Sequence, residues 1–305
     1  MKRTLLLGGA GFIGSALARR LVEDGHTVTV VDDFSRGARD RLPAGIRVIP
    51  ADVRTPGWRI GLRNEGTDWL FCLAGVVGVP NVESAPFRTW EVTTHAVMAA
   101  LEIPAAKRFF ASTSEVYGYA PPAPSERVAV SVPDVLAPRA VYALAKLWGE
   151  QAFIHRGEPY CIGRFHNVYG PAMGTDHVIP RFCLQLLNGE PLHVDDPTAI
   201  RAFCYIDDAV EAILQAMAVP TSEVFNIGNP TEPVTMEALM GRLKRIAGQA
   251  ERPVTEGHNK PGFPRVRVPE IARLWLMTGF TPRVSLDEGL ARTYAAGKKP
   301  NNATG

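Results

Sequence analysis

The chain has 305 residues, 46% of them hydrophobic and 21% charged, with a formal net charge of +2 at neutral pH. This length and composition are typical of a globular protein with one large α/β domain or two smaller ones, and they give no argument for a nucleic-acid partner. No apolar run reaches the roughly 18 residues of a membrane span, and the cysteines have no C-x-x-C spacing, so we expect a cytoplasmic protein with free thiols and no metal site.

The first half of the chain alternates short apolar runs with longer helical patterns. We expect β-strands at residues 4–7, 27–31, 47–49, 69–73, 107–111 and 160–165, and long helices at residues 87–102 and 141–155. Strands that alternate with helices predict βαβ units and therefore an α/β fold with a Rossmann-type, doubly wound parallel sheet. The proline-rich stretch 121–138 predicts an ordered loop between the fifth strand and the next helix.

The C-terminal part predicts a smaller α/β lobe, with helical patterns near residues 179–187, 207–218 and 235–247. We divide the chain into a Rossmann domain, a smaller C-terminal lobe and a disordered tail, at residues 1–170, 171–296 and 297–305. The boundary between the first two is soft, because the extended segments 202–205 and 224–227 can also return to the main sheet.

A glycine-rich motif, G-x-x-G-x-x-G, lies directly behind the first expected strand at Gly8, Gly11 and Gly14. A strand, this turn and a helix together make a site for a dinucleotide pyrophosphate. The glycines let the backbone approach the phosphates, and the helix N-terminus offers free N–H groups. Glycine-rich turns follow strands for other reasons too, so the motif alone indicates only a phosphate site.

Asp32 ends the second expected strand, where a carboxylate can accept hydrogen bonds from the adenosine ribose. Such a carboxylate repels a 2′-phosphate, so we predict NAD rather than NADP, although Arg36 and Arg39 lie close by. The alternative is that Asp32 is merely the polar end of a strand. Loops at the same edge of the sheet complete the predicted cofactor site: Gly8, Gly11, Phe12, Ile13, Gly14, Asp32, Asp33, Ser35, Asp52, Val53, Leu73, Ala74 and Gly75.

Tyr142 and Lys146 are four residues apart in the second long helix, so they share one face. We expect the ammonium to lower the pKa of the tyrosine towards neutral, which suits Tyr142 to act as a general base on a hydroxyl. The pattern Y-x-x-x-K is common on exposed helices. Its position one helix after residues 111–118, which carry hydroxyls and a carboxylate to the ligand edge of the sheet, makes it specific.

With these motifs the sequence resembles the extended short-chain dehydrogenases/reductases of the nucleotide-sugar epimerase/dehydratase family, from Leu5 to about Thr293. The resemblance implies that Thr113, Tyr142 and Lys146 form the catalytic set, with Tyr142 as base and Lys146 on the cofactor ribose. It also implies a nucleotide-sugar site at Asn167, Val178, Arg201 and Arg267. Thr93 stands where the family often has Asn.

The resemblance implies a redox cycle at C4 of a UDP-linked sugar, in which NAD takes a hydride and a transient 4-ketone forms. Reduction from the other face makes a 4-epimerase, loss of the C6 carboxylate a UDP-glucuronate decarboxylase, and loss of water a dehydratase. Ser114 replaces the acid of the 4,6-dehydratases, which disfavours elimination. Ser114 and Glu115 with Arg267 resemble the decarboxylases, whereas residues 73–79 and 203–205 resemble the 4-epimerases. We favour 4-epimerisation narrowly, with decarboxylation as the alternative.

A function of another class is a non-catalytic protein that senses dinucleotide. Degenerate proteins of that kind usually lose the tyrosine or the lysine, and both are present here. Members of the family pair the helices that correspond to residues 87–102 and 141–155 into a four-helix bundle between two subunits. The resemblance therefore implies a homodimer.

Overall fold

The central element is a seven-stranded sheet in the order β11-β6-β5-β4-β1-β2-β3, in which all neighbouring strands are parallel. The computed structural model describes residues 1–118, 123–130, 134–257 and 265–298. The strands of the sheet are β1 (Arg3–Leu7), β2 (Thr27–Asp32), β3 (Arg47–Pro50), β4 (Thr67–Cys72), β5 (Ala105–Thr113), β6 (Tyr160–Phe165) and β11 (Glu223–Ile227). The predicted Rossmann-type sheet is confirmed, and it contains all the strands expected from the first half of the chain.

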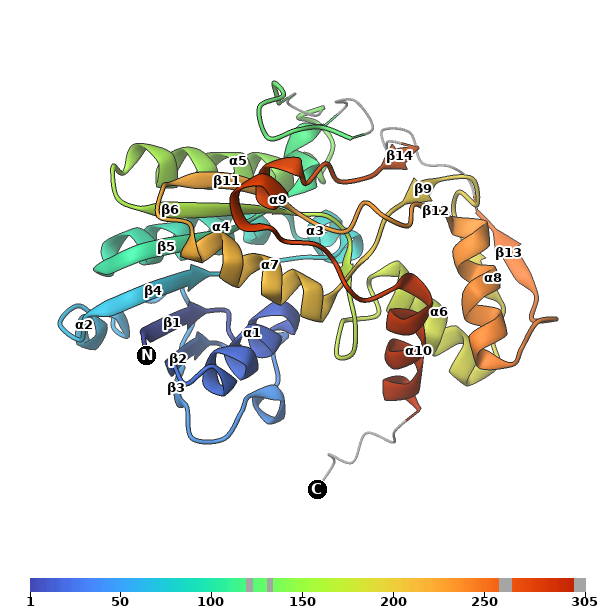
Figure 1. Cartoon of the computed structure of the whole chain (residues 1–305), viewed down its shortest axis with the longest axis horizontal. Helices are drawn as coiled ribbons and strands as arrows, with labels where there is room; N and C mark the ends of the chain where they lie inside the picture. Colours follow the sequence, from blue (N-terminus) through green and yellow to red (C-terminus); the bar gives the residue numbers. More distant parts are fainter. Residues whose placement is uncertain (119–122, 131–133, 258–264, 299–305) are drawn as a thin grey trace.

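Helices cover both faces of this sheet (Figure 1). Leu6 of β1 belongs to a core that includes residues of α1 (Phe12–Glu23) and α7 (Ile206–Ala218). Its neighbours Leu5 and Leu7 belong to a second core with α4 (Pro86–Glu102) and α5 (Ala140–His155). A strand buried on both faces needs a continuous apolar run rather than alternation, which explains the sequence pattern of β1.

The C-terminal part adds one strand to the main sheet. β11 pairs with β6, so residues 224–227 return to the sheet. The other soft segment does not, because β10 (Cys204–Tyr205) pairs with β7 (Val168–Tyr169) in a separate sheet. Two further small sheets, β12-β9-β14 and β13-β8, are built from β8 (Leu192–Val194), β9 (Ile200–Arg201), β12 (Val234–Thr235), β13 (Val254–Glu256) and β14 (Val266–Arg267). The domain boundary at residue 170 stays a prediction.

Helices α6 (Val178–Asn188), α8 (Met236–Ala247) and α10 (Leu286–Gly297) pack against one another on the right of Figure 1. Thr235 and Ser285 cap the N-termini of α8 and α10, and their hydroxyls accept hydrogen bonds from backbone N–H groups of the first turn. The remaining helical elements are α2 (Arg59–Leu62), α3 (Val79–Ser84), α9 (Ala272–Thr278) and the 3-10 turns η1 (Arg39–Arg41) and η2 (Ser114–Tyr117).

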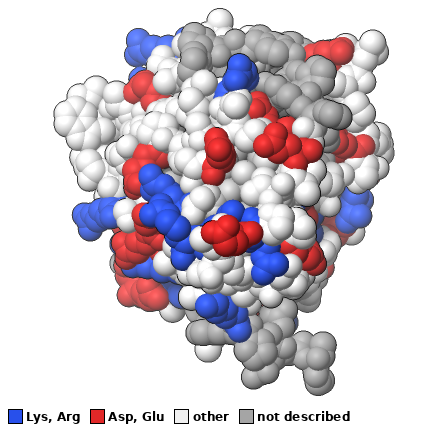
Figure 2. Space-filling model, turned by 90° about the vertical axis from the view of Figure 1, so that its right-hand side faces the viewer, with Lys and Arg blue, Asp and Glu red and all other residues white. Residues whose placement is uncertain are grey.

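Acidic and basic side chains are interspersed on the face that carries α8 (Figure 2). The described residues of this face therefore show no single-sign patch of the kind that nucleic-acid-binding surfaces use. None of the described helices is long and apolar enough to cross a membrane. Residues 299–305 of the predicted tail, and residues 121–122 and 131–133 of the predicted ordered loop, lie outside the described residues.

The variant Phe225→Ala is expected to lower the free energy of unfolding by about 3–5 kcal/mol, because the ring of β11 is fully buried in the core and its removal leaves a cavity. Urea unfolding measures this change. The control is Leu276→Ala, whose side chain is 73% exposed, with an expected change within about 0.5 kcal/mol. Equal effects of the two variants would contradict the integration of β11 into the sheet.

Candidate active site

The carboxyl ends of the parallel strands open into a cavity of about 1080 Å³, which segments of the C-terminal part also line. Every residue that the sequence assigned to catalysis, to the cofactor or to the substrate lines this one cavity. The loop after β1, the loop after β2 and the N-terminal turn of α6 thus meet, although they are far apart in the sequence. The roles of the individual residues stay predictions.

The glycine turn between β1 and α1 has room only for backbone. Gly8 has φ +80°, and a Cβ on it would lie 2.6 Å from the Ala74 nitrogen; a Cβ on Gly14 would lie 2.4 Å from the Gly8 oxygen. At Gly11, by contrast, a Cβ would meet only the Gly8 oxygen, at 3.4 Å. The turn therefore packs tightly against β4 and α1 while its outer backbone borders the cavity, which fits a dinucleotide pyrophosphate.

Asp32 holds the glycine turn from the end of β2. One carboxylate oxygen accepts a hydrogen bond from the Ala10 N–H at 2.8 Å, and the other accepts one from the Phe34 N–H at 2.9 Å. Burial raises the pKa of Asp32, and these two hydrogen bonds oppose the rise. The carboxylate organises the glycine turn and also lines the cavity. Its place at the polar end of a strand is therefore compatible with the predicted role at the cofactor.

Arg36 is turned towards the C-terminal part of the chain. Its guanidinium forms an ion pair with Asp176, and the same carboxylate oxygen accepts a hydrogen bond from Asn81 Nδ2 at 2.8 Å. A guanidinium engaged in this way does not act as a dedicated partner for a 2′-phosphate, so the structure weakens the part of the argument against NAD that rests on Arg36.

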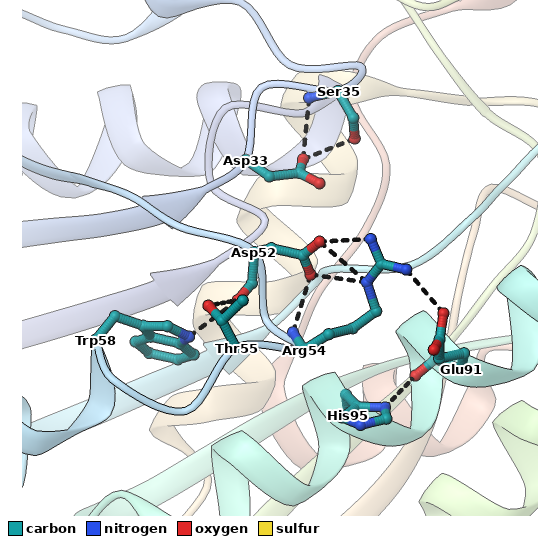
Figure 3. Close-up of polar contacts among 8 residues, drawn as sticks. All are labelled: Asp33, Ser35, Asp52, Arg54, Thr55, Trp58, Glu91 and His95. Carbon is teal, nitrogen blue, oxygen red and sulfur yellow. Dashed lines mark hydrogen bonds and ion pairs between the residues drawn. The ribbon is translucent and has the colours of Figure 1, made fainter.

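The loop after β3 carries a second acidic residue whose charge is already paired (Figure 3). Arg54 binds both carboxylate oxygens of Asp52, at 2.6–3.0 Å, and reaches Glu91 of α4 at 2.7 Å. The hydrogen bonds of Arg54 lower the pKa of Asp52. In the neighbouring loop, Asp33 accepts hydrogen bonds from the N–H and the hydroxyl of Ser35. Both carboxylates therefore shape their loops at the rim of the cavity.

Tyr142 and Lys146 both lie in the cavity wall, on one side of α5. The Lys146 Nζ donates a hydrogen bond to the Ala111 carbonyl at 2.7 Å and lies 5.9 Å from the centre of the Tyr142 ring. Burial raises the pKa of Tyr142, the charge of Glu115 raises it further, and a hydrogen bond with Thr113 opposes the rise. The expectation that Lys146 lowers this pKa towards neutral is therefore wrong for this arrangement, because burial raises the pKa and the opposing contributions come from Thr113 and Arg139.

Glu115 of η2 forms a bidentate ion pair that the sequence analysis missed. Its partner is Arg139, the residue immediately before α5, with N–O distances of 3.1 and 2.6 Å. Burial lowers the pKa of Arg267, Glu115 opposes this shift, and Arg139 adds to it. Two guanidinium groups are thus within electrostatic reach of one carboxylate, next to the buried Ser114.

Arg201 and Arg267 are neighbours in the β9–β14 pair, where they are register partners. Burial lowers the pKa of Arg201 to about 10, and the charge of Arg267 contributes to this shift. In the described part of the chain neither guanidinium forms an ion pair with a carboxylate. Two adjacent, half-buried guanidinium groups in a cavity wall are suited to bind a polyanion such as a diphosphate.

Thr93 of α4 has a buried hydroxyl with no hydrogen-bond partner among the described residues. It lies beside Gly75, since a Cβ there would be 3.8 Å from the hydroxyl and 3.5 Å from the Lys146 Nζ. Thr93 is fully buried and is not among the described residues that line the cavity, so its hydroxyl lies behind the cavity wall.

His177, at the start of α6, is a further cavity residue that the sequence analysis did not assign to the site. Burial lowers its pKa, and the charges that act on it are Asp176, Arg36, Arg139 and Glu115. No group of three or more metal-ligating side chains occurs in the described part of the chain.

Comparison with known proteins reveals similarity along nearly the whole chain. Residues 4–228 match the profile described as "NAD dependent epimerase/dehydratase family". A UDP-N-acetyl-alpha-D-glucosaminuronate decarboxylase of Bacillus cytotoxicus is 34% identical over 96% of this chain and 96% of its own length. UDP-glucuronic acid decarboxylase 1 of Xenopus tropicalis is 33% identical over 96% of this chain and 71% of its own.

Two solved structures are also similar. The UDP-glucose 4-epimerase of Thermotoga maritima is 28% identical, with a TM-score of 0.83, over 97% of this chain and 99% of its own. The UDP-glucuronic acid 4-epimerase of Bacillus cereus, in complex with UDP-glucuronic acid and NAD, is 27% identical, with a TM-score of 0.83, over 96% of this chain and 98% of its own.

Lys146→Met is expected to remove a pH dependence from the free energy of unfolding. Burial lowers the pKa of Lys146 to about 8, against 10.5 in an unfolded chain. Between these values the unfolded state binds more protons, so stability rises with pH. In wild type this rise amounts to about 3 kcal/mol.

Urea unfolding from pH 7 to pH 11 measures the free energy of unfolding of the variant and of wild type. Subtracting one from the other cancels the contributions of the other titrating groups. The difference, variant minus wild type, is expected to fall by about 3 kcal/mol across this range. The exposed Lys298→Met is the matched control and should give a constant difference. A constant difference for Lys146→Met as well would show that the ammonium is not desolvated.

Proposed function

The chain belongs to the NAD dependent epimerase/dehydratase family, and on that premise we propose that it oxidises a UDP-linked uronate at C4 and decarboxylates the resulting 4-ketone. The family dependence on NAD agrees with the cofactor predicted from Asp32. The relatives with 33–34% identity act on uronates according to their names. One is named a decarboxylase of UDP-N-acetyl-alpha-D-glucosaminuronate and the other a decarboxylase of UDP-glucuronic acid.

The observation that carries the proposal is the charge cluster of Glu115, Arg139 and Arg267 beside the catalytic set. Two cations and one anion leave this cluster with an excess positive charge. A sugar with a neutral C6 hydroxymethyl group leaves this positive charge uncompensated, whereas the C6 carboxylate of a uronate compensates it. The cluster therefore favours a uronate as substrate, and the names of the relatives with 33–34% identity favour decarboxylation over the 4-epimerisation that the sequence narrowly indicated.

The chain's own residues supply the binding and proton chemistry. Bound along the glycine turn with Asp32 at its ribose, NAD supplies the acceptor and later the donor of the C4 hydride, together with a positive charge that favours the Tyr142 phenolate. Tyr142 then takes the proton of the C4 hydroxyl while Thr113 hydrogen-bonds to its oxygen. Arg201 holds the diphosphate, Arg267 holds the sugar at its C6 carboxylate, and Asn167 and Val178 line the sugar site.

A ketone at C4 turns the C6 carboxylate into a β-keto acid. The C5–C6 bond breaks, its electron pair passes into the C4 carbonyl to form an enolate, and carbon dioxide leaves. Tyr142, now protonated, donates a hydrogen bond to the enolate oxygen. C5 then takes up one proton, the C4 ketone receives the hydride back, and the phenol proton returns to the C4 oxygen. The net reaction consumes one proton and releases one molecule of carbon dioxide.

4-Epimerisation is the second candidate, and one specific observation favours it. The similar UDP-glucuronic acid 4-epimerase acts on a uronate without removing its carboxylate, according to its name. The same Thr113, Tyr142 and Lys146 would serve, because the ketone needs only to present its other face before it is reduced. A dehydratase has less support, since Ser114 cannot act as the acid of a 4,6-elimination.

We expect the purified protein to convert UDP-glucuronate to a UDP-pentose with loss of carbon dioxide. Tyr142→Phe should lower kcat by a factor of about 100 or more, because the C4 proton then has no base. Mass spectrometry of the products of UDP-glucuronate, UDP-N-acetylglucosaminuronate and UDP-glucose measures the outcome, with Tyr160→Phe, outside the cavity, as control. A product of unchanged mass would make the enzyme a 4-epimerase, and no turnover of any substrate would favour the dinucleotide sensor.

We further propose a homodimer in which α4 and α5 form a four-helix bundle with the same helices of a second subunit. These two helices pack against each other, and their Trp90 and Trp148 rings lie 6.2 Å apart. On the outer side of α4, Phe87 is 76% exposed and Met98 46% exposed. A row of exposed apolar side chains on a long helix is characteristic of an interface.

Phe87→Glu is expected to convert the dimer to a monomer, because a carboxylate would be buried in the bundle without a partner. Light scattering at micromolar concentration measures the mass. Leu276→Glu is the matched control, since Leu276 of α9 is 73% exposed but lies outside α4 and α5. A wild-type protein of monomer mass would refute the proposal.

We also propose that the protein works in the cytoplasm. All four cysteines are free and buried, namely Cys72, Cys161, Cys183 and Cys204. Unpaired thiols are typical of proteins in a reducing compartment.

A further inference from the structure

Asn226, near the carboxyl end of β11, is fully buried and uses both ends of its side-chain amide. The amide oxygen accepts a hydrogen bond from the Tyr117 hydroxyl at 2.8 Å, and His166 Nε2 lies 3.2 Å from the same oxygen. The amide nitrogen donates to the carbonyl oxygens of Pro124 at 3.0 Å and Glu270 at 2.8 Å. The F-N-I-G motif at residues 225–228 thus forms a buried hydrogen-bond network that has no role yet in the proposed reaction.

The partners allow only one orientation of this amide. Two carbonyl oxygens require donors, so the nitrogen must face Pro124 and Glu270. Burial lowers the pKa of His166 to about 3, which keeps its ring neutral, and the hydrogen on Nε2 then points to the amide oxygen. An aspartate at position 226 would set a carboxylate oxygen against two carbonyl oxygens.

The two ends of Asn226 reach the segments that carry the charge cluster. Tyr117 belongs to η2, the same 3-10 turn as Glu115. Glu270 is three residues beyond Arg267, and Pro269 between them is pressed against Gly228, where a Cβ would lie 2.8 Å from the proline ring. One buried side chain therefore joins the turn that carries Glu115 to the segment that carries Arg267.

A second contact braces the Tyr117 ring from the side of the catalytic helix. The Arg164 guanidinium lies 4.9 Å from the centre of this ring, and it is paired with Glu150 of α5 at 2.6 Å. Glu150 is one helical turn beyond Lys146 and also accepts a hydrogen bond from Ser112 of β5. Asn226 is therefore connected through Tyr117 and Arg164 to the helix that carries Tyr142.

We propose that Asn226 is a positioning residue that fixes Glu115 relative to Arg267 and so retains the 4-ketone until it is reduced. The inference rests on the proposed function, because it assigns a role in the second half of that reaction. When the two charges are misplaced, the ketone is held less well and dissociates. Each escaped ketone leaves one hydride on the cofactor, so the UDP-uronate and NAD⁺ yield the decarboxylated 4-ketone, carbon dioxide and NADH, with no net change in protons and no return of the hydride.

The test compares Asn226→Asp and Tyr117→Phe with wild type, on the full chain loaded with NAD and supplied with UDP-glucuronate. Absorbance of reduced nicotinamide counts escaped ketone, and mass spectrometry counts completed product. We expect the ratio of ketone to product to rise about tenfold and KM to rise, while NADH forms in the first half-reaction at nearly the wild-type rate. Asn229→Ala is the matched control, since among the described residues this buried asparagine accepts hydrogen bonds only from Thr231, two positions along the chain.

Tyr117→Phe deletes one hydroxyl and retains the ring. A wild-type ratio of ketone to product in this variant would overturn the inference. This variant also provides the test if Asn226→Asp does not fold. An equal rise of the ratio in Asn229→Ala would also overturn it, because general destabilisation would then suffice. The proposed function fails separately: a wild-type product of unchanged mass rules out decarboxylation, whereas the ketone-to-product ratio still tests Asn226.

Discussion

The burial of both faces of the central parallel sheet is the constraint on which the rest of the molecule depends. Helices occupy both faces, so a ligand can reach the sheet only at the edge where the loops leave the strands. All strands are parallel, so their carboxyl ends share that edge. It receives the glycine turn after β1, Asp32 of β2, Thr113 at the end of β5 and Asn167 after β6.

Burial also explains the electrostatics of the cavity. It lowers the pKa of Lys146, Arg201 and Arg267 and raises that of Tyr142, so every one of these groups is pushed towards its neutral form. A dinucleotide, a nucleoside diphosphate and a uronate carry the negative charges that relieve the cations. The proposed reaction therefore takes place where ligand charge and protein charge complement each other in a low-dielectric environment.

Several features were predictable from sequence because they are local. The strands of the first half are short apolar runs, and the glycine turn is a fixed spacing next to one of them. The pKa of Tyr142 was predicted wrongly because the i, i+4 spacing to Lys146 says nothing about burial or about Ala111, which takes the ammonium. Arg139 was missed because an arginine before a helix is common and Glu115 is 24 residues away in the sequence.

The sequence by itself determined six of the seven strands of the sheet, the phosphate turn and the types of residue that the chemistry needs, since each depends on neighbours within a few positions. Only the tertiary structure decided which charges face each other. Tyr117 and Asn226 are 109 positions apart, and Asn226 and Glu270 are 44 apart. Contacts at such separations follow from the packing of β11 beside β6, a pairing that no local pattern encodes, and they connect Glu115 to Arg267.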